Sequence, residues 1–173
     1  MGYTHYWRQL RDFTDTEWQE LMRLTKLITA SSGRDIILSE FNINNEEIRF
    51  NGYGEEGHET FLITKKKRAK ADYEEQEAYD RQGAFEFCKT AHKPYDKYVV
   101  AVLCALYNMA GQKEWPLGDG KIMSISSDGN TEDWTEGLFL AVRSTWEQEM
   151  VCPIRDCLTL SYVDYVDQEK KTG

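Results

Sequence analysis

The chain has 173 residues, a formal net charge of −9 at pH 7, 40% hydrophobic residues and 13% aromatic residues. This length fits one domain, and this apolar content supports a folded core rather than a disordered chain. The acidic excess argues against duplex DNA as a partner, because duplex binding relies on Lys and Arg that neutralise phosphates. A small anionic ligand remains compatible with the charge, because local fields decide where it binds.

The sequence contains no stretch that approaches the ~18 uncharged apolar residues of a membrane span. Its longest apolar run is Val99–Leu106, and the N-terminal sequence MGYTHYW lacks the basic and apolar regions of a secretory signal. We therefore expect a cytoplasmic protein with no membrane partner.

The four cysteines form no C-x-x-C pair, so their spacing does not favour a zinc site. We expect Cys88, Cys104, Cys152 and Cys157 to be small buried residues, as unpaired cysteines usually are. A disulfide between Cys152 and Cys157 is the minor alternative.

The N-terminal segment alternates aromatic and polar residues and predicts a short strand over 2–7. Tyr3, His5 and Trp7 then share one face, and Thr4 and Tyr6 share the other. The pattern does not decide which face belongs to the core.

The next segment carries a capping box, in which Thr14 is followed three residues later by Glu17. This signal predicts a helix over Asp15–Ala30. Its buried face is expected to consist of the residues that recur at helical spacing, namely Trp18, Leu21, Met22, Thr25 and Ile28.

Three short strands are expected next, over Ile36–Leu38, Glu47–Phe50 and Glu59–Thr64, with Asn42–Asn45 as a turn. The last two strands are expected to pair as a hairpin. The charged stretch that follows, at about 65–77, changes from basic to acidic and is interpreted as a solvated loop.

The second half of the chain predicts a strand over 85–88 and a long helix from Pro94 to Gly111. Its buried stripe is expected to be Val99, Val102, Leu103, Leu106 and Ala110. A strand over 121–126, a helix capped by Thr131, a strand over 158–166 and a flexible tail over 168–173 complete the prediction. The apolar positions of the capped helix are Trp134, Leu138, Ala141, Val142 and Thr145.

We expect a single α+β domain over residues 1–167, with a mostly antiparallel sheet and about three helices.

The expected helix start at Pro94 is a candidate anion site, because free N–H groups and the helix dipole attract negative charge there. Lys89, Thr90 and Lys93 immediately precede it. The alternative is that Thr90 caps the helix while both lysines point to solvent.

Two histidines at strand starts, His5 and His58, are candidates for acid–base chemistry or ligand contacts. Glu59, Asp128 and Asp133 are carboxylates that could pair with them. No H-x-H or H-E-x-x-H spacing is present, so we expect no metal and no cofactor. Cys88 with His58 or His92 is a weaker nucleophile–base candidate, because a cysteine in an alternating strand is more often buried.

Several aromatic residues combine a stacking face with a polar edge, which suits the binding of bases and sugars. The loop around Ser127 joins a strand to a helix, a common position for ligand contacts. The residues expected to bind a ligand are Tyr3, His5, Tyr6, His58, Glu59, Lys89, Thr90, Lys93, Tyr95, Ser127 and Asp128.

Four segments together resemble an uncharacterised family of small proteins encoded by phages and prophages. They are GYTHYW at 2–7, HETF at 58–61, FEFCKTA-x-KPYD at 85–96, and SSDG at 126–129 with the following DW at 133–134. The resemblance spans most of the chain. It implies an accessory role such as host takeover or evasion of host defence, and it supplies no activity or ligand.

The sequence therefore favours a binding module that holds a small anionic, nucleotide-like ligand and sequesters a host signal. One alternative is a small hydrolase that acts on such a ligand with His and Asp as acid and base, or with a metal. Another alternative is an acidic inhibitor that occupies the basic groove of a host enzyme, which requires a continuous acidic face. A homodimer or a host protein is the further partner considered. Whether the chain is an enzyme is left open, with binding preferred.

Overall fold

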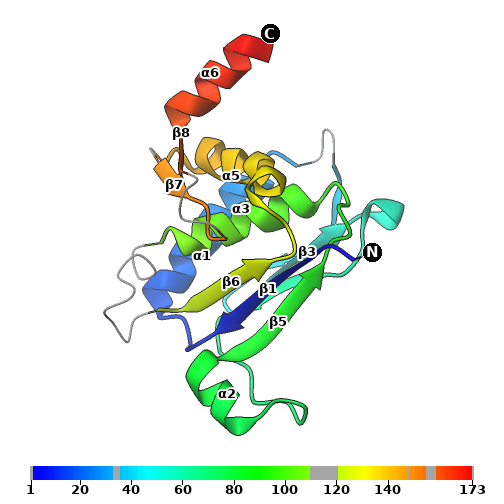
Figure 1. Ribbon diagram of the computed structural model, residues 1–173, viewed down its shortest axis with the longest axis vertical. Helices are drawn as coiled ribbons and strands as arrows, with labels where there is room; N and C mark the ends of the chain where they lie inside the picture. The colour runs from blue at the N-terminus through cyan, green and yellow to red at the C-terminus, as the bar shows by residue number, and fades with distance from the viewer. Residues whose placement is uncertain (1, 33–35, 110–120, 148, 155–158, 173) are drawn as a thin grey trace.

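Strand β1 (Thr4–Gln9) is the centre of a three-stranded antiparallel sheet in the computed structural model of the chain (Figure 1). Strand β5 (Ala84–Lys89) pairs with one edge of β1 and strand β6 (Met123–Ser127) with the other. Tyr3, His5 and Trp7 are at most 5% exposed, so theirs is the core face of the expected strand. The structure describes residues 2–32, 36–109, 121–147, 149–154 and 159–172.

Three long helices pack behind this sheet: α1 (Asp15–Thr29), α3 (Asp96–Tyr107) and α5 (Thr131–Thr145) (Figure 1). The expected α+β class is confirmed, with mixed helices and antiparallel sheets in one domain. Among its described residues, none of the helices is long and apolar enough to cross a membrane.

Helix α3 is buried on all sides from Tyr98 to Leu106. The expectation of a single buried stripe on this helix is therefore wrong, because α3 packs against α1, α5 and β6 at once. The helix begins at Asp96 rather than at Pro94. Ala110 and Gly111, where we expect the helix to end, lie outside the described residues.

The capping signals account for the starts of α1 and α5. Thr14 and Glu17 form the expected capping box, and all five apolar positions expected on α1 are buried. The expectation that Thr131 caps α5 is wrong: Asn130 is the cap, and its side chain accepts hydrogen bonds from the N–H groups of Glu132 and Asp133. Asn is as effective a cap as Thr, so Thr131 becomes the first helical residue. The five apolar positions expected on α5 are buried.

A second three-stranded sheet contains β2 (Leu38–Ile43), β3 (Glu47–Gly52) and β4 (Phe61–Thr64), and the 3-10 turn η1 (Gly54–Glu56) lies between β3 and β4. The expected hairpin is confirmed, with Phe50 opposite Phe61. The strand expected over Ile36–Leu38 and the turn over Asn42–Asn45 are misplaced. Strand β2 begins at Leu38 and ends at Ile43. The turn after it is shorter than expected, and the Asn44 side chain closes it by accepting hydrogen bonds from two N–H groups.

The charged stretch is more ordered than a solvated loop. Arg68 binds the carboxylates of Glu74 and Glu86 and donates to the carbonyl oxygen of Phe85, which fastens the stretch to β5. Its acidic half leads into helix α2 (Gln76–Gln82), which the sequence analysis does not predict.

The C-terminal part contains β7 (Glu149–Val151), β8 (Thr159–Ser161) and α6 (Tyr162–Thr172). The strand expected over 158–166 is thus a short strand followed by a helix, and residues 168–172 of the expected tail are helical. Cys88, Cys104 and Cys152 are buried as expected, whereas Cys157 lies outside the described residues.

Candidate functional site

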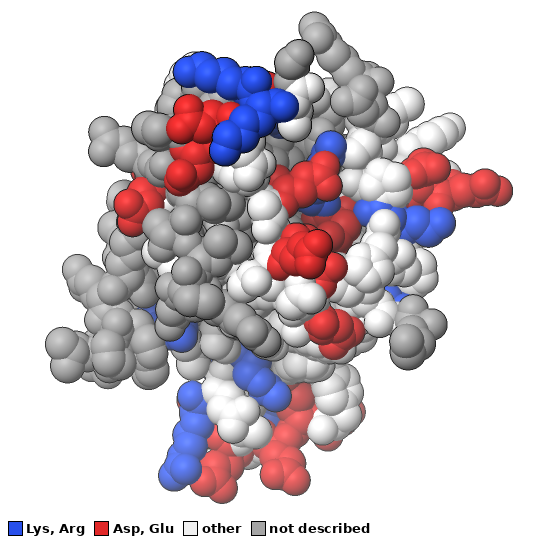
Figure 2. All heavy atoms as spheres, turned by 45° about the horizontal axis from the view of Figure 1, so that its top comes forward, with Lys and Arg blue, Asp and Glu red and all other residues white. Residues whose placement is uncertain are grey.

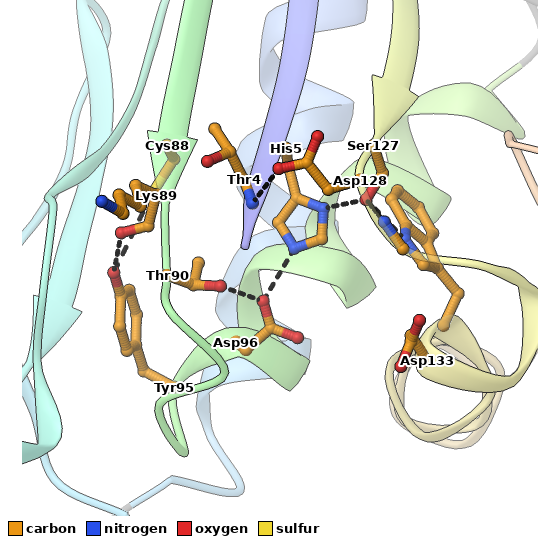
Figure 3. Close-up of polar contacts among 12 residues, drawn as sticks. Thr4, His5, Cys88, Lys89, Thr90, Tyr95, Asp96, Ser127, Asp128 and Asp133 are labelled. Carbon is orange, nitrogen blue, oxygen red and sulfur yellow. Dashed lines mark hydrogen bonds and ion pairs between the residues drawn. The ribbon is translucent and has the colours of Figure 1, made fainter. Parts of the chain in front are cut away.

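The imidazole of His5 is completely buried at the centre of the candidate site (Figure 3). Its Nε2 lies 2.7 Å from Asp96 Oδ1, and its Nδ1 lies 2.9 Å from Ser127 Oγ. The alternation of β1 turns His5 inward, and its two partners come from the start of α3 and the last residue of β6. Three segments that are distant in the sequence therefore meet at one side chain.

The partners of Ser127 decide the direction of these hydrogen bonds. Ser127 Oγ accepts from the Gly129 N–H at 2.9 Å and from Trp134 Nε1 at 3.2 Å. With both lone pairs used, the hydroxyl hydrogen points to His5 Nδ1, and the hydrogen on Nε2 points to Asp96. A neutral His5 with its hydrogen on Nε2 satisfies every group in this chain.

Asp96 is the first residue of α3, where the helix dipole favours a negative charge. Besides the bond from His5, its Oδ1 accepts a hydrogen bond from the Thr90 hydroxyl at 2.5 Å. The N-cap residue, Tyr95, makes no capping hydrogen bond through its side chain. The helix end expected to attract a ligand anion thus already holds a carboxylate of the chain, and Thr90 binds that carboxylate instead of capping the helix.

A strained turn places His92 on the ring of Tyr3. Ala91 and His92 both have left-handed backbone angles, with φ of 51° and 56°, which non-glycine residues adopt at some energetic cost. The N–H groups of Thr90 and Ala91 hold the turn by donating to the Tyr3 carbonyl oxygen. The two rings stack with centroids 3.7 Å apart and planes at 23°, and His92 remains exposed. An exposed imidazole is therefore held rigidly above the buried network.

The hydroxyl of Tyr3 is buried and makes no hydrogen bond of normal geometry. Burial is the main cause that raises the pKa of Tyr3, and the nearby carboxylates of Asp96 and Asp133 raise it further. A hydrogen bond from the Ser127 hydroxyl to the Tyr3 oxygen would lower the pKa of Tyr3. The hydrogen of that hydroxyl points to His5 instead. Tyr3 is therefore a neutral phenol at physiological pH.

A surface hollow of about 350 Å³ opens beside this turn. Lys93 and Lys97 both contribute to its lining. Lys93 Nζ donates to the Glu55 carbonyl oxygen at 2.8 Å, and Lys97 Nζ lies 3.5 Å from Glu136 Oε1. The hollow is lined by Ile36, His92, Lys93, Pro94, Asp96, Lys97 and Glu136. It combines cations, carboxylates and an exposed ring, and Asp96 connects it to His5.

A second buried cluster joins β5 to the start of β4. The Tyr95 hydroxyl donates to the Glu59 carbonyl oxygen at 2.6 Å, and the Lys89 N–H donates to Glu59 Oε2 at 2.7 Å. Cys88 lies beside them with no exposed surface, and burial raises the pKa of its thiol to about 12. A buried thiol that stays protonated does not act as the nucleophile considered for Cys88.

The four sequence motifs converge, as their contacts show. The Thr90 N–H donates to the Tyr3 carbonyl, the Asp128 N–H to the Thr4 carbonyl, and the Glu59 N–H to the Lys89 carbonyl. The expected ligand-binding residues nevertheless lie in three places. Four of them are buried inside the protein, with Ser127 half-buried beside them: Tyr3, His5, Thr90 and Tyr95. Three lie on the outer side of the sheet: Tyr6, Lys89 and Asp128. Three lie near the η1 turn: His58, Glu59 and Lys93.

Asp96, Lys97 and Glu136 are not among the site residues expected from the sequence, and His92 is expected there only as a base for Cys88. A signal for two of them exists. Asp96 ends the KPYD segment, and Lys97 follows it directly, so both belong to the helix start that the sequence marks as a candidate anion site. Glu136 comes from α5, and only the packing of α5 against α3 brings it to the hollow.

Charged side chains on the face drawn in Figure 2 lie in separate groups, with acidic, basic and uncharged residues interleaved. The inhibitor hypothesis requires a continuous acidic surface, and the described residues of this face do not provide one. Within the described residues, no group of three His, Cys, Asp or Glu side chains is placed to hold a metal ion.

Comparison of the chain with protein-family models, curated proteins and solved structures finds no match.

Proposed function

We propose that the protein is a binding module for a small anionic ligand with an aromatic part, of the nucleotide class, and that the His92 hollow is its site. The observation that carries this proposal is the placement of Lys93, Lys97 and the exposed ring of His92 around one hollow of about 350 Å³. A hollow of this size lies within the usual range of small-molecule sites.

Each part of a nucleotide has a counterpart in this hollow. The ammonium groups of Lys93 and Lys97 attract phosphate, and an ammonium has three hydrogens, so Lys93 can bind a ligand while it keeps its bond to Glu55. The His92 ring offers a stacking surface that Tyr3 holds in place. Asp96 and Glu136 can accept hydrogen bonds from sugar hydroxyls.

The proposed role is to hold the ligand without turning it over. The buried chain behind the hollow, from Trp134 through Ser127 and His5 to Asp96, has each polar group satisfied, which favours a rigid support over a reactive centre. A protein that binds a nucleotide signal and sequesters it suits the accessory, phage-type role that the sequence motifs imply.

A thermal-shift panel of mono-, di- and cyclic nucleotides tests the proposal, because a ligand that binds the folded state raises the melting temperature. We expect at least one nucleotide to stabilise the protein, and a Lys93→Ala/Lys97→Ala double variant to lose that stabilisation. A matched control is Lys26→Ala/Lys66→Ala, which removes two exposed lysines outside the hollow. No shift across the panel, or an equal shift in the Lys93/Lys97 variant, would contradict the proposal.

A second candidate function is hydrolysis with Ser127 as the nucleophile and His5 as the base. It is favoured by the order Ser127, His5, Asp96 in one hydrogen-bonded chain, with steps of 2.9 and 2.7 Å. It ranks second because the N–H groups of Gly129 and Trp134 occupy both lone pairs of Ser127 Oγ. A covalent fluorophosphonate adduct at Ser127, seen by mass spectrometry and absent in Ser127→Ala, would support it, and an unmodified Ser127 would exclude it.

A further inference from the structure

The outer face of the β5-β1-β6 sheet is not covered by any of the helices that the structure describes. In Figure 1 this face is turned toward the viewer, and α1, α3 and α5 lie behind the sheet. The outward positions of β1 and β5 alternate with the buried residues of the core, and cross-strand pairing sets Tyr6 opposite Phe87 and Arg8 opposite Phe85. A central strand and an edge strand thus present aromatic and cationic side chains on an open face.

The aromatic rings of this face form a continuous row. The rings of Tyr6 and Phe85 have centroids 6.0 Å apart with planes at 19°, and those of Phe85 and Phe87 are also 6.0 Å apart. Phe87 is 50% exposed, although it belongs to a well-paired strand. Placing several partly exposed rings side by side costs solvation energy, and such patches usually mark interaction sites.

Cations, hydroxyls and one carboxylate surround the row of rings, and the Tyr6 hydroxyl donates to that carboxylate, Asp128, at 3.4 Å. The Arg8 guanidinium lies 5.0 Å from the centre of the Phe85 ring, and Lys89 occupies the outward position opposite Thr4. Ser124 and Ser126 of β6 lie opposite Arg8 and Tyr6. The face therefore offers stacking surfaces, positive charge and hydrogen-bonding groups together.

The surface continues toward helix α2. A hollow of about 230 Å³ lies between the sheet and α2. It is lined by Arg8, Phe85, Tyr73 and Tyr79 together with Glu74, Glu75 and Ala78. Tyr73 is 76% exposed and extends the aromatic surface beyond the strands. The Lys67 ammonium lies 3.8 Å from the centre of the Tyr79 ring, which adds a cation at this end.

We propose that this open sheet face binds single-stranded nucleic acid, as a site separate from the His92 hollow. Unpaired bases stack on the aromatic rings of sheets largely without regard to sequence, and flanking Arg and Lys contact the phosphates. Here the rings of Tyr6, Phe85 and Phe87 supply the stacking, and Arg8 and Lys89 supply the charge. Duplex DNA does not fit this chemistry, because its bases are stacked inside and closed to the rings.

A second copy of the chain fits this face less well than a nucleic acid. A two-fold symmetric contact places the same patch on both sides, so Arg8 and Lys89 of one copy face the same cations of the other. Like charges opposed across an interface are unfavourable. Phosphates are complementary to these two side chains.

Fluorescence anisotropy with a labelled oligo-dT or oligo-U of about 12 nucleotides tests the proposal, because an oligomer of this length spans a typical single-stranded site. We expect saturable binding that weakens as salt is raised from about 50 to about 200 mM. Phe87→Ala is expected to weaken binding about tenfold, the effect of losing one stacking partner. Phe41→Ala is the matched control, because Phe41 is also 50% exposed and lies on strand β2.

The cationic part of the face has its own variant. Arg8→Gln is expected to weaken binding and to lower the slope of the salt dependence by about one, as the loss of one phosphate contact does. Lys26→Gln, on the exposed side of α1, is its control and is expected to leave the slope unchanged.

Three results would overturn the proposal. The first is no saturable binding of either oligonucleotide at low salt. The second is equal affinity for wild type and Phe87→Ala. The third is a wild-type dimer in light scattering that Phe87→Ala converts to a monomer, which would assign the face to a second copy. Retention of oligonucleotide binding by Lys93→Ala/Lys97→Ala separates this site from the nucleotide hollow.

Discussion

Asp96 Oδ1 lies 2.7 Å from His5 Nε2, and this contact fastens the first turn of α3 to the central strand of the sheet (Figure 3). The same imidazole holds Ser127 at the start of the loop that leads to α5. A single buried side chain thus joins the end of β6 to the start of α3, and α3 contributes Asp96 and Lys97 to the proposed nucleotide hollow. The stability of the fold and the shape of the hollow both depend on it.

Replacing His5 with Ala is expected to lower the free energy of unfolding by about 2–4 kcal/mol, because it opens a cavity and leaves Asp96 and Ser127 without a partner. Denaturant unfolding monitored by circular dichroism measures this change. The control is His58→Ala, since His58 is exposed and is expected to change stability by less than about 0.5 kcal/mol. Equal effects of the two variants would contradict a central role for His5.

Two buried tyrosines provide a matched pair of hydroxyl deletions. Tyr95→Phe removes the donor to the Glu59 carbonyl oxygen and is expected to cost about 1–2 kcal/mol. Tyr3→Phe removes a hydroxyl that makes no normal hydrogen bond and is expected to leave stability unchanged or raise it by up to about 1 kcal/mol. Urea unfolding of both variants checks the difference, and a reversed order would show that the Tyr3 hydroxyl has a partner.

Gly137 is the point where α5 comes closest to α3. A Cβ added at this position would lie 2.4 Å from Val100 Cγ1 and 3.0 Å from the Lys97 carbonyl oxygen. In an exposed helix Gly→Ala adds about 1 kcal/mol of stability, but overpacking here costs about 1–3 kcal/mol. We expect Gly137→Ala to lower the melting temperature while Glu136→Ala, on the exposed side, does not. A higher melting temperature for Gly137→Ala would show that the two helices separate easily.

The carboxylate of Glu74 gives the charged stretch a defined pH dependence. The Arg68 guanidinium first, and then the N–H groups of Ala71 and Phe85, lower the pKa of Glu74 from its ordinary 4.5 to about 2. Because the folded state favours the ionised form, this group stabilises the fold fully above pH 4.5, and the contribution is lost as the pH falls toward 2.

Urea unfolding of wild type and Glu74→Gln at several pH values measures this contribution. The difference between the two proteins is expected to be largest above pH 4.5 and to shrink steadily toward pH 2. A difference that is the same at every pH would show that Glu74 acts through packing and not through its charge.

Local signals in the sequence predict those parts of the fold that depend on neighbouring residues. The capping box at Thr14 predicts the start of α1, and the alternation at 2–7 predicts that Tyr3, His5 and Trp7 share a face. Helix α2 is not predicted from the sequence. The stretch that leads into it is held by the contact of Arg68 with β5, which is distant in the sequence. The all-round burial of α3 depends on three packing partners at once, which periodicity alone does not reveal.

The candidate site is predictable in part for the same reason. The four motifs contain most of the residues that meet around His5, but the sequence does not tell which of them are buried. Tyr95 is a residue type that often contacts ligands, but it is completely buried. His92, two residues before the proline, is exposed. The left-handed turn at Ala91 and His92 causes this difference. The sequence does not predict such a turn, because neither residue is a glycine.

Native mass spectrometry of the freshly purified protein, followed by titration with nucleotides that stabilise it, tests the central claim most directly. The account predicts a one-to-one complex with a nucleotide, lost in Lys93→Ala/Lys97→Ala and kept in Lys26→Ala/Lys66→Ala. A protein that carries no ligand and forms no complex with any nucleotide, or a complex that survives in the Lys93/Lys97 variant, would contradict it.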